Sequence, residues 1–219
     1  MKKKIVALLL VAVLFVSAAP TVTLGAVEGF ARMLVPPTLV FDAVYTFRDG
    51  MAWVRSGRRV GFVNQFGDVV IPLEFEFVSF FFNDGLARAR YRGRYGFIDK
   101  TGEWVIPRQF SYAQNFRNGI AQVVYDNRFG VINTSGEMVV PNLFSSLSPF
   151  GDGLFIARKG AWGTNTTGVV DLYGNTLVPF EYANLFGKGY GLLGGFIIDP
   201  CGGRRTGIIN LYNEVILPF

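Results

Sequence analysis

A twelve-residue pattern recurs five times in this chain of 219 residues, and it restricts the fold more than any other feature. Each copy begins with glycine, has Asn or Asp three residues later and ends with proline; the copies are 61–72, 96–107, 130–141, 168–179 and 207–218. The leading glycines are 35, 34, 38 and 39 residues apart. A unit of about 35 residues buries little apolar surface alone, so such units stack on their neighbours. The sequence therefore predicts a tandem array.

A second module lies between these copies. It covers 75–90, 110–124 and 144–158, with an earlier copy at 41–55. Each copy contains a glycine preceded by Asp or Asn and followed by two apolar residues; these glycines are Gly50, Gly85, Gly119 and Gly153. Asp-Gly and Asn-Gly pairs favour tight hairpin turns, because glycine adopts positive φ angles without a steric penalty.

Short β-strands account for both modules. In the first, an apolar run ends at Asn or Asp, a turn containing Gly67, Gly102, Gly136 or Gly174 reverses the chain, and a β-branched run ends at proline. No helical periodicity is sustained after residue 26. We therefore predict an all-β fold, in which tandem repeats of about 35 residues, each with three or four short antiparallel strands, stack as an open array. A closed five-bladed, propeller-like ring is the alternative, because its two partial ends would complement each other.

The block from Arg94 to Phe110 (RYGFIDKTGEWVIPRQF) resembles the WG repeat of bacterial proteins. The resemblance covers 36–219. The position of the tryptophan that gives this family its name is occupied by other residues, namely Val60, Tyr95, Phe129, Thr167 and Thr206, whereas Trp162-Gly163 keeps the pair. The resemblance implies an extracytoplasmic repeat protein that binds partners, and it supplies no catalytic residues.

The N-terminus has the pattern of an export signal. Lys2, Lys3 and Lys4 precede an apolar run, 5–16, that is too short to span a bilayer. We predict a signal peptide at 1–26, cleaved after Ala18 or Ala26, a linker at 27–35 and the repeat domain at 36–219; an uncleaved membrane anchor is the alternative. Removing 1–18 lowers the net charge from +5 to +2, so we expect no nucleic-acid partner. The predicted location is secreted or in the cell envelope, with no stable membrane span after cleavage.

The candidate binding residues are basic and aromatic. On the predicted strand around 88–95 they are Arg88, Arg90, Arg92 and Arg94 with Tyr91 and Tyr95, and on the preceding repeat they are Arg55, Arg58 and Arg59. Guanidinium groups beside tyrosines bind carboxylates or phosphates by paired hydrogen bonds and stacking. An anionic cell-wall polymer is one predicted partner and a protein is the other. A charged, solvated strand edge explains the same residues without a ligand.

Most catalytic chemistry is excluded by composition. The chain has no His and one Cys, so it has no His-dependent triad, His-ligated metal site or internal disulfide. We expect a non-catalytic binding or scaffold module without metal or cofactor. The alternative is a carboxylate-dependent carbohydrate-active enzyme that uses a pair such as Glu74 and Glu76. We expect Asp99, Asn133, Asp171 and Asn210, which share a repeat position, to close turns. We expect Cys201 to be buried and inert, and a disulfide to another molecule is the alternative.

The aromatic residues fall into two groups. Some recur at fixed repeat positions and are expected in the core: Phe75, Phe110 and Phe144, and also Phe80, Phe116 and Phe150. Others do not recur and are candidates for a surface platform that stacks on sugars or peptide side chains: Trp53, Tyr112, Tyr125, Tyr182 and Tyr190.

Overall fold

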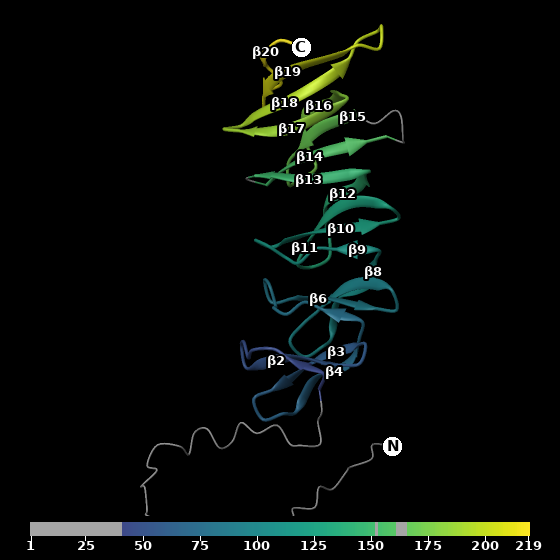
Figure 1. Ribbon diagram of the computed structural model, residues 1–219, viewed down its shortest axis with the longest axis vertical. Coiled ribbons are helices and arrows are strands. Elements are labelled where there is room, and N and C mark those ends of the chain that lie inside the picture. The colour runs from purple at the N-terminus through teal and green to yellow at the C-terminus, as the bar shows by residue number, and fades with distance from the viewer. Residues whose placement is uncertain (1–40, 152, 161–165) are drawn as a thin grey trace, which may run out of the picture. The chain divides into compact units, whose positions relative to one another are not determined.

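A computed structural model describes residues 41–151, 153–160 and 166–219 (Figure 1). These residues form 20 strands in five antiparallel four-stranded sheets. The predicted signal peptide, the linker and the Trp162-Gly163 pair lie outside the described residues. The described residues contain no helix that is long and apolar enough to cross a membrane.

Each sheet joins one second module to the first module that follows it. Sheet 1 contains β1 (Ala43–Val44), β2 (Met51–Ser56), β3 (Arg59–Asn64) and β4 (Val69–Phe75). Sheet 2 contains β5 (Phe77–Val78), β6 (Ala87–Tyr91), β7 (Arg94–Ile98) and β8 (Trp104–Phe110). Sheet 3 contains β9 (Tyr112–Ala113), β10 (Ile120–Tyr125), β11 (Arg128–Asn133) and β12 (Met138–Phe144).

The last two sheets follow the same order, with longer first strands. Sheet 4 contains β13 (Ser146–Gly151), β14 (Leu154–Lys159), β15 (Thr166–Val170) and β16 (Thr176–Tyr182). Sheet 5 contains β17 (Asn184–Gly189), β18 (Leu192–Ile198), β19 (Arg204–Asn210) and β20 (Val215–Leu217). Every strand pairs with its neighbour in sequence, so each sheet is a simple meander.

The sheets stack in sequence order as an open array, as predicted (Figure 1). Four apolar clusters each join one sheet to the next. Burial on the fourth strand shows that the last sheet has no such cover. Equivalent residues on the first four sheets are at most 1% exposed (Ile71, Ile106, Val140 and Val178), whereas Leu217 on sheet 5 is 55% exposed. A closed ring would cover Leu217, so the ring alternative is not formed.

The glycine that begins each first module allows the fourth strand to approach closely. A methyl group at Gly96 would lie 2.6 Å from the carbonyl oxygen of Ile106 and 2.7 Å from the Trp104 ring. At Gly130 it would lie 2.9 Å from the carbonyl oxygen of Val140. The pairing of the third and fourth strands is irregular at the same place. Contact with the neighbouring backbone therefore requires glycine here.

Three of the four predicted Asp-Gly and Asn-Gly hairpin turns are confirmed, and the fourth, at Gly153, includes residue 152, which lies outside the described residues. Asp49-Gly50, Asp84-Gly85 and Asn118-Gly119 have positive φ at both residues. Each pair lies between two residues that form an antiparallel bridge, for example Asn83 with Leu86. This geometry is that of the type I′ turn, which matches the twist of the strands it joins.

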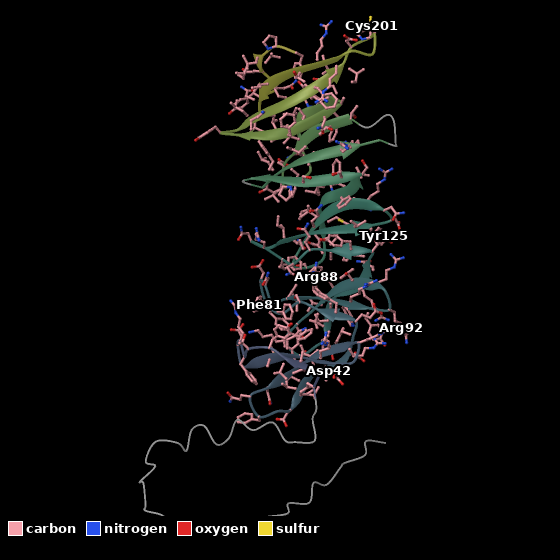
Figure 2. All side chains as sticks on the ribbon, in the orientation of Figure 1. Asp42, Phe81, Arg88, Arg92, Tyr125 and Cys201 are labelled. Carbon is pink, nitrogen blue, oxygen red and sulfur yellow. The ribbon has the colours of Figure 1, made fainter. Side chains whose placement is uncertain are left out.

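Two expectations about burial are wrong. Phe80 is 43% exposed, and Phe82 packs against the core in its place, 5.5 Å from the ring of Phe62. Sheet 2 has one more residue between its first strand and its Asp-Gly turn than sheets 1 and 3 have, so the position equivalent to Phe116 is Phe82. Cys201 is exposed rather than buried, because it lies in the β18–β19 turn, where its N–H donates to Asp199 Oδ1 at 3.0 Å (Figure 2).

Candidate ligand-binding tip and inter-sheet clefts

The predicted basic residues divide between hairpin tips and sheet interiors. Arg92 and Gly93 form the two-residue turn between β6 and β7, with φ angles of 49° and 77°. Arg94 follows this turn, and Arg58 lies in the equivalent turn between β2 and β3. Arg55 and Arg59 flank that first turn, and Arg55, Arg58, Arg59, Arg92 and Arg94 are all exposed.

Two arginines and two aromatic rings meet at the tip of sheet 2. The guanidinium carbon of Arg108 lies 4.8 Å from the Tyr91 ring centre and 6.0 Å from that of Trp104. The guanidinium carbon of Arg92 lies 5.4 Å from the Tyr91 ring centre. These contacts orient two exposed cations side by side, since guanidinium groups favour the face of an aromatic ring. We call this group, Tyr91, Arg92, Trp104 and Arg108, the arginine tip.

The arginine tip extends to sheet 1 through Arg59 and Glu74. Arg59 Nη1 donates to the backbone carbonyl of Glu74 at 2.6 Å. Glu74 and the arginine tip line a shallow hollow of about 190 Å³. This lining has two guanidinium groups against one carboxylate, so its charge favours an anion. The sequence pointed to Tyr91 and Arg92 and named Glu74 only as one of a candidate catalytic pair. It did not reveal Trp104 and Arg108, which come from the fourth strand of sheet 2.

Arg88 and Arg90 do not belong to the arginine tip. Arg88 points from sheet 2 toward sheet 3, where its Nη1 donates to the Ala113 carbonyl, and Figure 2 places Arg88 inside the stack and Arg92 at its margin. The Arg88 guanidinium lies 4.8 Å from the Phe77 ring centre and 5.6 Å from that of Tyr95. Arg90 Nε lies 3.4 Å from Glu76 Oε2. The four arginines therefore do not form one continuous strip.

Arg88 belongs to a recurring contact between sheets. A side chain on the second strand donates to a backbone carbonyl on the first strand of the next sheet: Trp53 Nε1 to Val78 at 3.1 Å, Arg88 Nη1 to Ala113 at 2.5 Å, and Gln122 Nε2 to Leu147 at 2.8 Å. The interval is 25 residues each time. This repetition identifies Arg88 as a residue that holds two sheets together.

The predicted aromatic platform is partly wrong. Trp53 and Tyr182 are buried. Trp53 points at sheet 2. Tyr182 occupies the repeat position that holds a phenylalanine in earlier sheets, namely Phe75, Phe110 and Phe144. Tyr112, Tyr125 and Tyr190 are exposed. An aromatic group that the sequence did not reveal lies at the other end of β6, where Phe81 is labelled in Figure 2. It contains Tyr45, Phe80 and Phe81, with Arg48 4.5 Å from the Phe81 ring centre.

A cleft of about 680 Å³ is lined mainly by sheets 3 and 4, with Asn83 and Arg88 from sheet 2, and several of its polar side chains bond within the stack. Gln114 Nε2 donates to Gln122 Oε1 at 3.1 Å, while Gln122 donates to the Leu147 carbonyl. Asn83 Nδ2 donates to the Phe116 carbonyl at 3.1 Å. These bonds stabilise the stack, and they leave fewer polar groups for a ligand.

The family model described as "WG containing repeat" matches residues 28–58, 61–95, 95–128 and 129–161. Together these matches cover more than half of the chain. The chain belongs to this family. Each match that lies within the described sheets joins the second half of one sheet to the first half of the next, so a WG repeat in sequence spans two sheets in space.

Other comparisons add little to the family assignment. No curated protein matches the chain. A structure titled "Crystal structure of the eukaryotic initiation factor" is 9% identical with a TM-score of 0.41, over 77% of this chain and 52% of that chain. A structure of putative TolB from Agrobacterium tumefaciens is 13% identical with a TM-score of 0.34, over 82% and 80%. This WG-repeat chain thus spans about half the length of the first of these structures.

The recurring Asn or Asp of the WG repeats closes a turn, as predicted. Its Oδ1 accepts from the backbone N–H groups two and four residues later, in Asp99, Asn133, Asp171 and Asn210 and also in Asn64. The hydrogen bond from the Thr101 side chain is the main cause that lowers the pKa of Asp99 below 3.8. Burial alone would raise the pKa of Asp171, but hydrogen bonds led by the Asn175 side chain lower it below 3.8.

These shifts predict an acid-sensitive contribution to stability. A carboxyl whose pKa is lower in the folded state stabilises the fold above its unfolded pKa, and this contribution is lost as the pH falls through the folded pKa. Asn occupies this position in other repeats of this chain, for example Asn133, whose Nδ2 donates to Glu137 while its Oδ1 accepts from the backbone, so Asp99→Asn next to Glu103 keeps the Oδ1 acceptor and removes the titration. We expect the Tm advantage of the wild type over this variant to shrink by about 1–2 °C between pH 7 and pH 3. Thermal unfolding at both pH values checks this, and a difference independent of pH contradicts it.

Proposed function

We propose that this WG-repeat protein is exported and acts as a non-catalytic binding module for an anionic polymer of the cell envelope. The lysine-rich start and short apolar run at 2–16 support export. The arginine tip is the observation that carries the proposal, because it presents oriented cations beside rings at an exposed edge. The ligand is a polymer because cations also lie on the neighbouring hairpin.

Repetition of cations along the edge favours a long ligand. Arg58 and Arg59 lie at the hairpin of sheet 1, and Arg92 and Arg94 lie at that of sheet 2. Packed sheets are about 10 Å apart, so a chain with regularly spaced carboxylates or phosphates meets cations from both sheets. Each exposed ionic contact contributes about 0.2–1 kcal/mol. Several such contacts are needed for useful affinity. A polymer makes several contacts at once, whereas a small anion does not.

The test compares two triple variants with equal change of charge. Arg58→Ser/Arg92→Ser/Arg108→Ser removes cations at the edge that carries the arginine tip, and Arg48→Ser/Arg117→Ser/Arg204→Ser removes three exposed cations elsewhere. With polygalacturonate and long-chain polyphosphate as probes, we expect the first variant to weaken binding of one or both by about tenfold or more. The second variant should change binding less than about threefold. Thermal unfolding of both variants verifies that they fold.

Three results would contradict the proposal. Equal loss in the two variants would mean that net charge, and not the arginine tip, governs binding. Retention of one envelope protein, without binding to either polymer, would favour the protein partner. Release of soluble fragments from a polysaccharide, abolished by a single carboxylate substitution, would favour the carbohydrate-active enzyme instead.

A further inference from the structure

In each sheet, one residue on each of the first three strands lies opposite a residue on the next strand, and the three form a row across the sheet. The residue types in this row differ between sheet 4 and sheets 2 and 3. The row contains Phe77, Arg90 and Tyr95 in sheet 2, Tyr112, Val124 and Phe129 in sheet 3, and Ser146, Arg158 and Thr167 in sheet 4. Sheets 2 and 3 therefore have two aromatic rings in the row, and sheet 4 has none. In sheet 1, where the row also lacks rings, the adjacent Trp53 reaches sheet 2.

A cleft of about 580 Å³ lies where sheet 4 lacks these rings. All three residues of the row line it, together with Asn184 from sheet 5. Its other wall is apolar and includes Ile156, Phe186 and Phe150. The Phe150 ring lies against the backbone of sheet 5, since a methyl group at Gly187 would be 2.5 Å from Phe150 Cε2. The cleft thus has one polar wall and one aromatic wall, within the volume range of ligand sites.

One buried polar atom of the cleft lining has no partner among the described residues. Thr167 lines the cleft and is 1% exposed, and its Oγ1 makes no hydrogen bond to any residue that the structure describes. Buried hydroxyl groups are normally hydrogen-bonded, so such an atom in a native structure requires an explanation. A ligand hydroxyl group at this point would satisfy it.

A cation lies directly opposite Thr167. Arg158 is paired in register with Thr167, and its Nη2 donates to Asn184 Oδ1 at 2.8 Å. None of the described carboxylates forms an ion pair with Arg158. The amide holds the guanidinium in place without neutralising it, so a ligand carboxylate would find a positioned cation.

We propose that this cleft binds a pyranose ring that carries a carboxylate, such as a uronic acid unit. The ring takes the space that Tyr95 and Phe129 fill in the equivalent rows and packs on the aromatic wall. The carboxylate pairs with Arg158, and ring hydroxyl groups bond to Thr167 and the serines of β13. The inference does not depend on the arginine tip, which lies on other sheets.

The test is calorimetric titration of the purified protein with D-glucuronate, D-glucose and benzoate. We expect glucuronate to bind with a Kd of about 1 mM or tighter. Glucose lacks the carboxylate and benzoate lacks the ring hydroxyl groups, so we expect both to bind at least about tenfold more weakly. Absence of glucuronate binding overturns the proposal, and so does tighter binding of benzoate. Arg58→Ser/Arg92→Ser/Arg108→Ser should bind glucuronate as the wild type does. Failure of the polymer proposal is therefore distinguishable from failure of the cleft proposal.

Three substitutions assign the binding to the cleft. Thr167→Phe places a ring where Phe129 has one, and we expect it to abolish glucuronate binding without lowering Tm. Thr167→Val keeps the shape and removes only the hydroxyl group, so it tests the same contact should the Phe variant fail to fold; we expect binding about fivefold weaker. Arg158→Gln should weaken binding by about tenfold or more, whereas Arg204→Gln, an exposed cation of sheet 5 outside the cleft, should not. Unchanged binding in both Thr167→Val and Arg158→Gln overturns the site.

Discussion

Replacing Phe97 by Ala is expected to lower the free energy of unfolding by about 3–5 kcal/mol. Phe97 is fully buried in the cluster that joins sheets 2 and 3, and its ring centre lies 4.5 Å from that of Phe116 on sheet 3. The substitution removes apolar contacts on both sides of one interface and leaves a cavity. Chemical denaturation measures the loss.

Phe66→Ala is the matched control, because it deletes the same ring from an exposed turn where Phe66 is 59% exposed. We expect it to change stability by less than about 0.5 kcal/mol. Equal losses in the two variants would show that the interface between sheets 2 and 3 does not stabilise the array.

Gly96→Ala is expected to destabilise the protein by about 1–3 kcal/mol or more, through overpacking. The added methyl group would meet the Ile106 carbonyl and the Trp104 ring, both closer than 3 Å, and backbone cannot move away as a flexible side chain does. Thermal and chemical unfolding measure the effect. Since Trp104 belongs to the arginine tip, we also expect the variant to bind anionic polymer less tightly.

Gly93→Asn controls for the loss of a glycine. Gly93 has φ +77° and no atom within 4 Å of an added methyl group, and Asn tolerates this conformation better than other residues. We expect a cost below about 1 kcal/mol. A larger cost for Gly93→Asn than for Gly96→Ala would contradict the close-approach explanation.

Features that depend on local sequence were predictable. The Asp-Gly turns, the Asn or Asp that closes each hairpin and the strands between them follow from neighbouring residues, and the structure confirms them. The all-β array follows from the repetition itself. The open form was predictable only as one of two alternatives, since closure depends on contacts between the ends that spacing does not determine.

Features that depend on register or on contacts between sheets were harder to predict. One additional residue in sheet 2 gives the core position to Phe82 rather than Phe80, and a change of ring type conceals that Tyr182 is equivalent to Phe110. The sequence grouped Arg88 with Tyr91, and only the stack shows that Arg88 meets Ala113 and that Arg108 joins Tyr91. The contacts that define the candidate sites come from different strands and sheets.

The salt dependence of polymer binding tests the central claim most directly. The Kd for polygalacturonate and for polyphosphate would be measured over a series of salt concentrations, for the wild type and for Arg58→Ser/Arg92→Ser/Arg108→Ser. Ionic contacts with a polyanion release counterions, so affinity falls steadily with salt and each lost contact reduces the slope. We predict a steep dependence in the wild type for at least one polymer and a shallower one in the variant. Binding that is insensitive to salt, or equally sensitive in both proteins, would contradict the proposed function of the arginine tip.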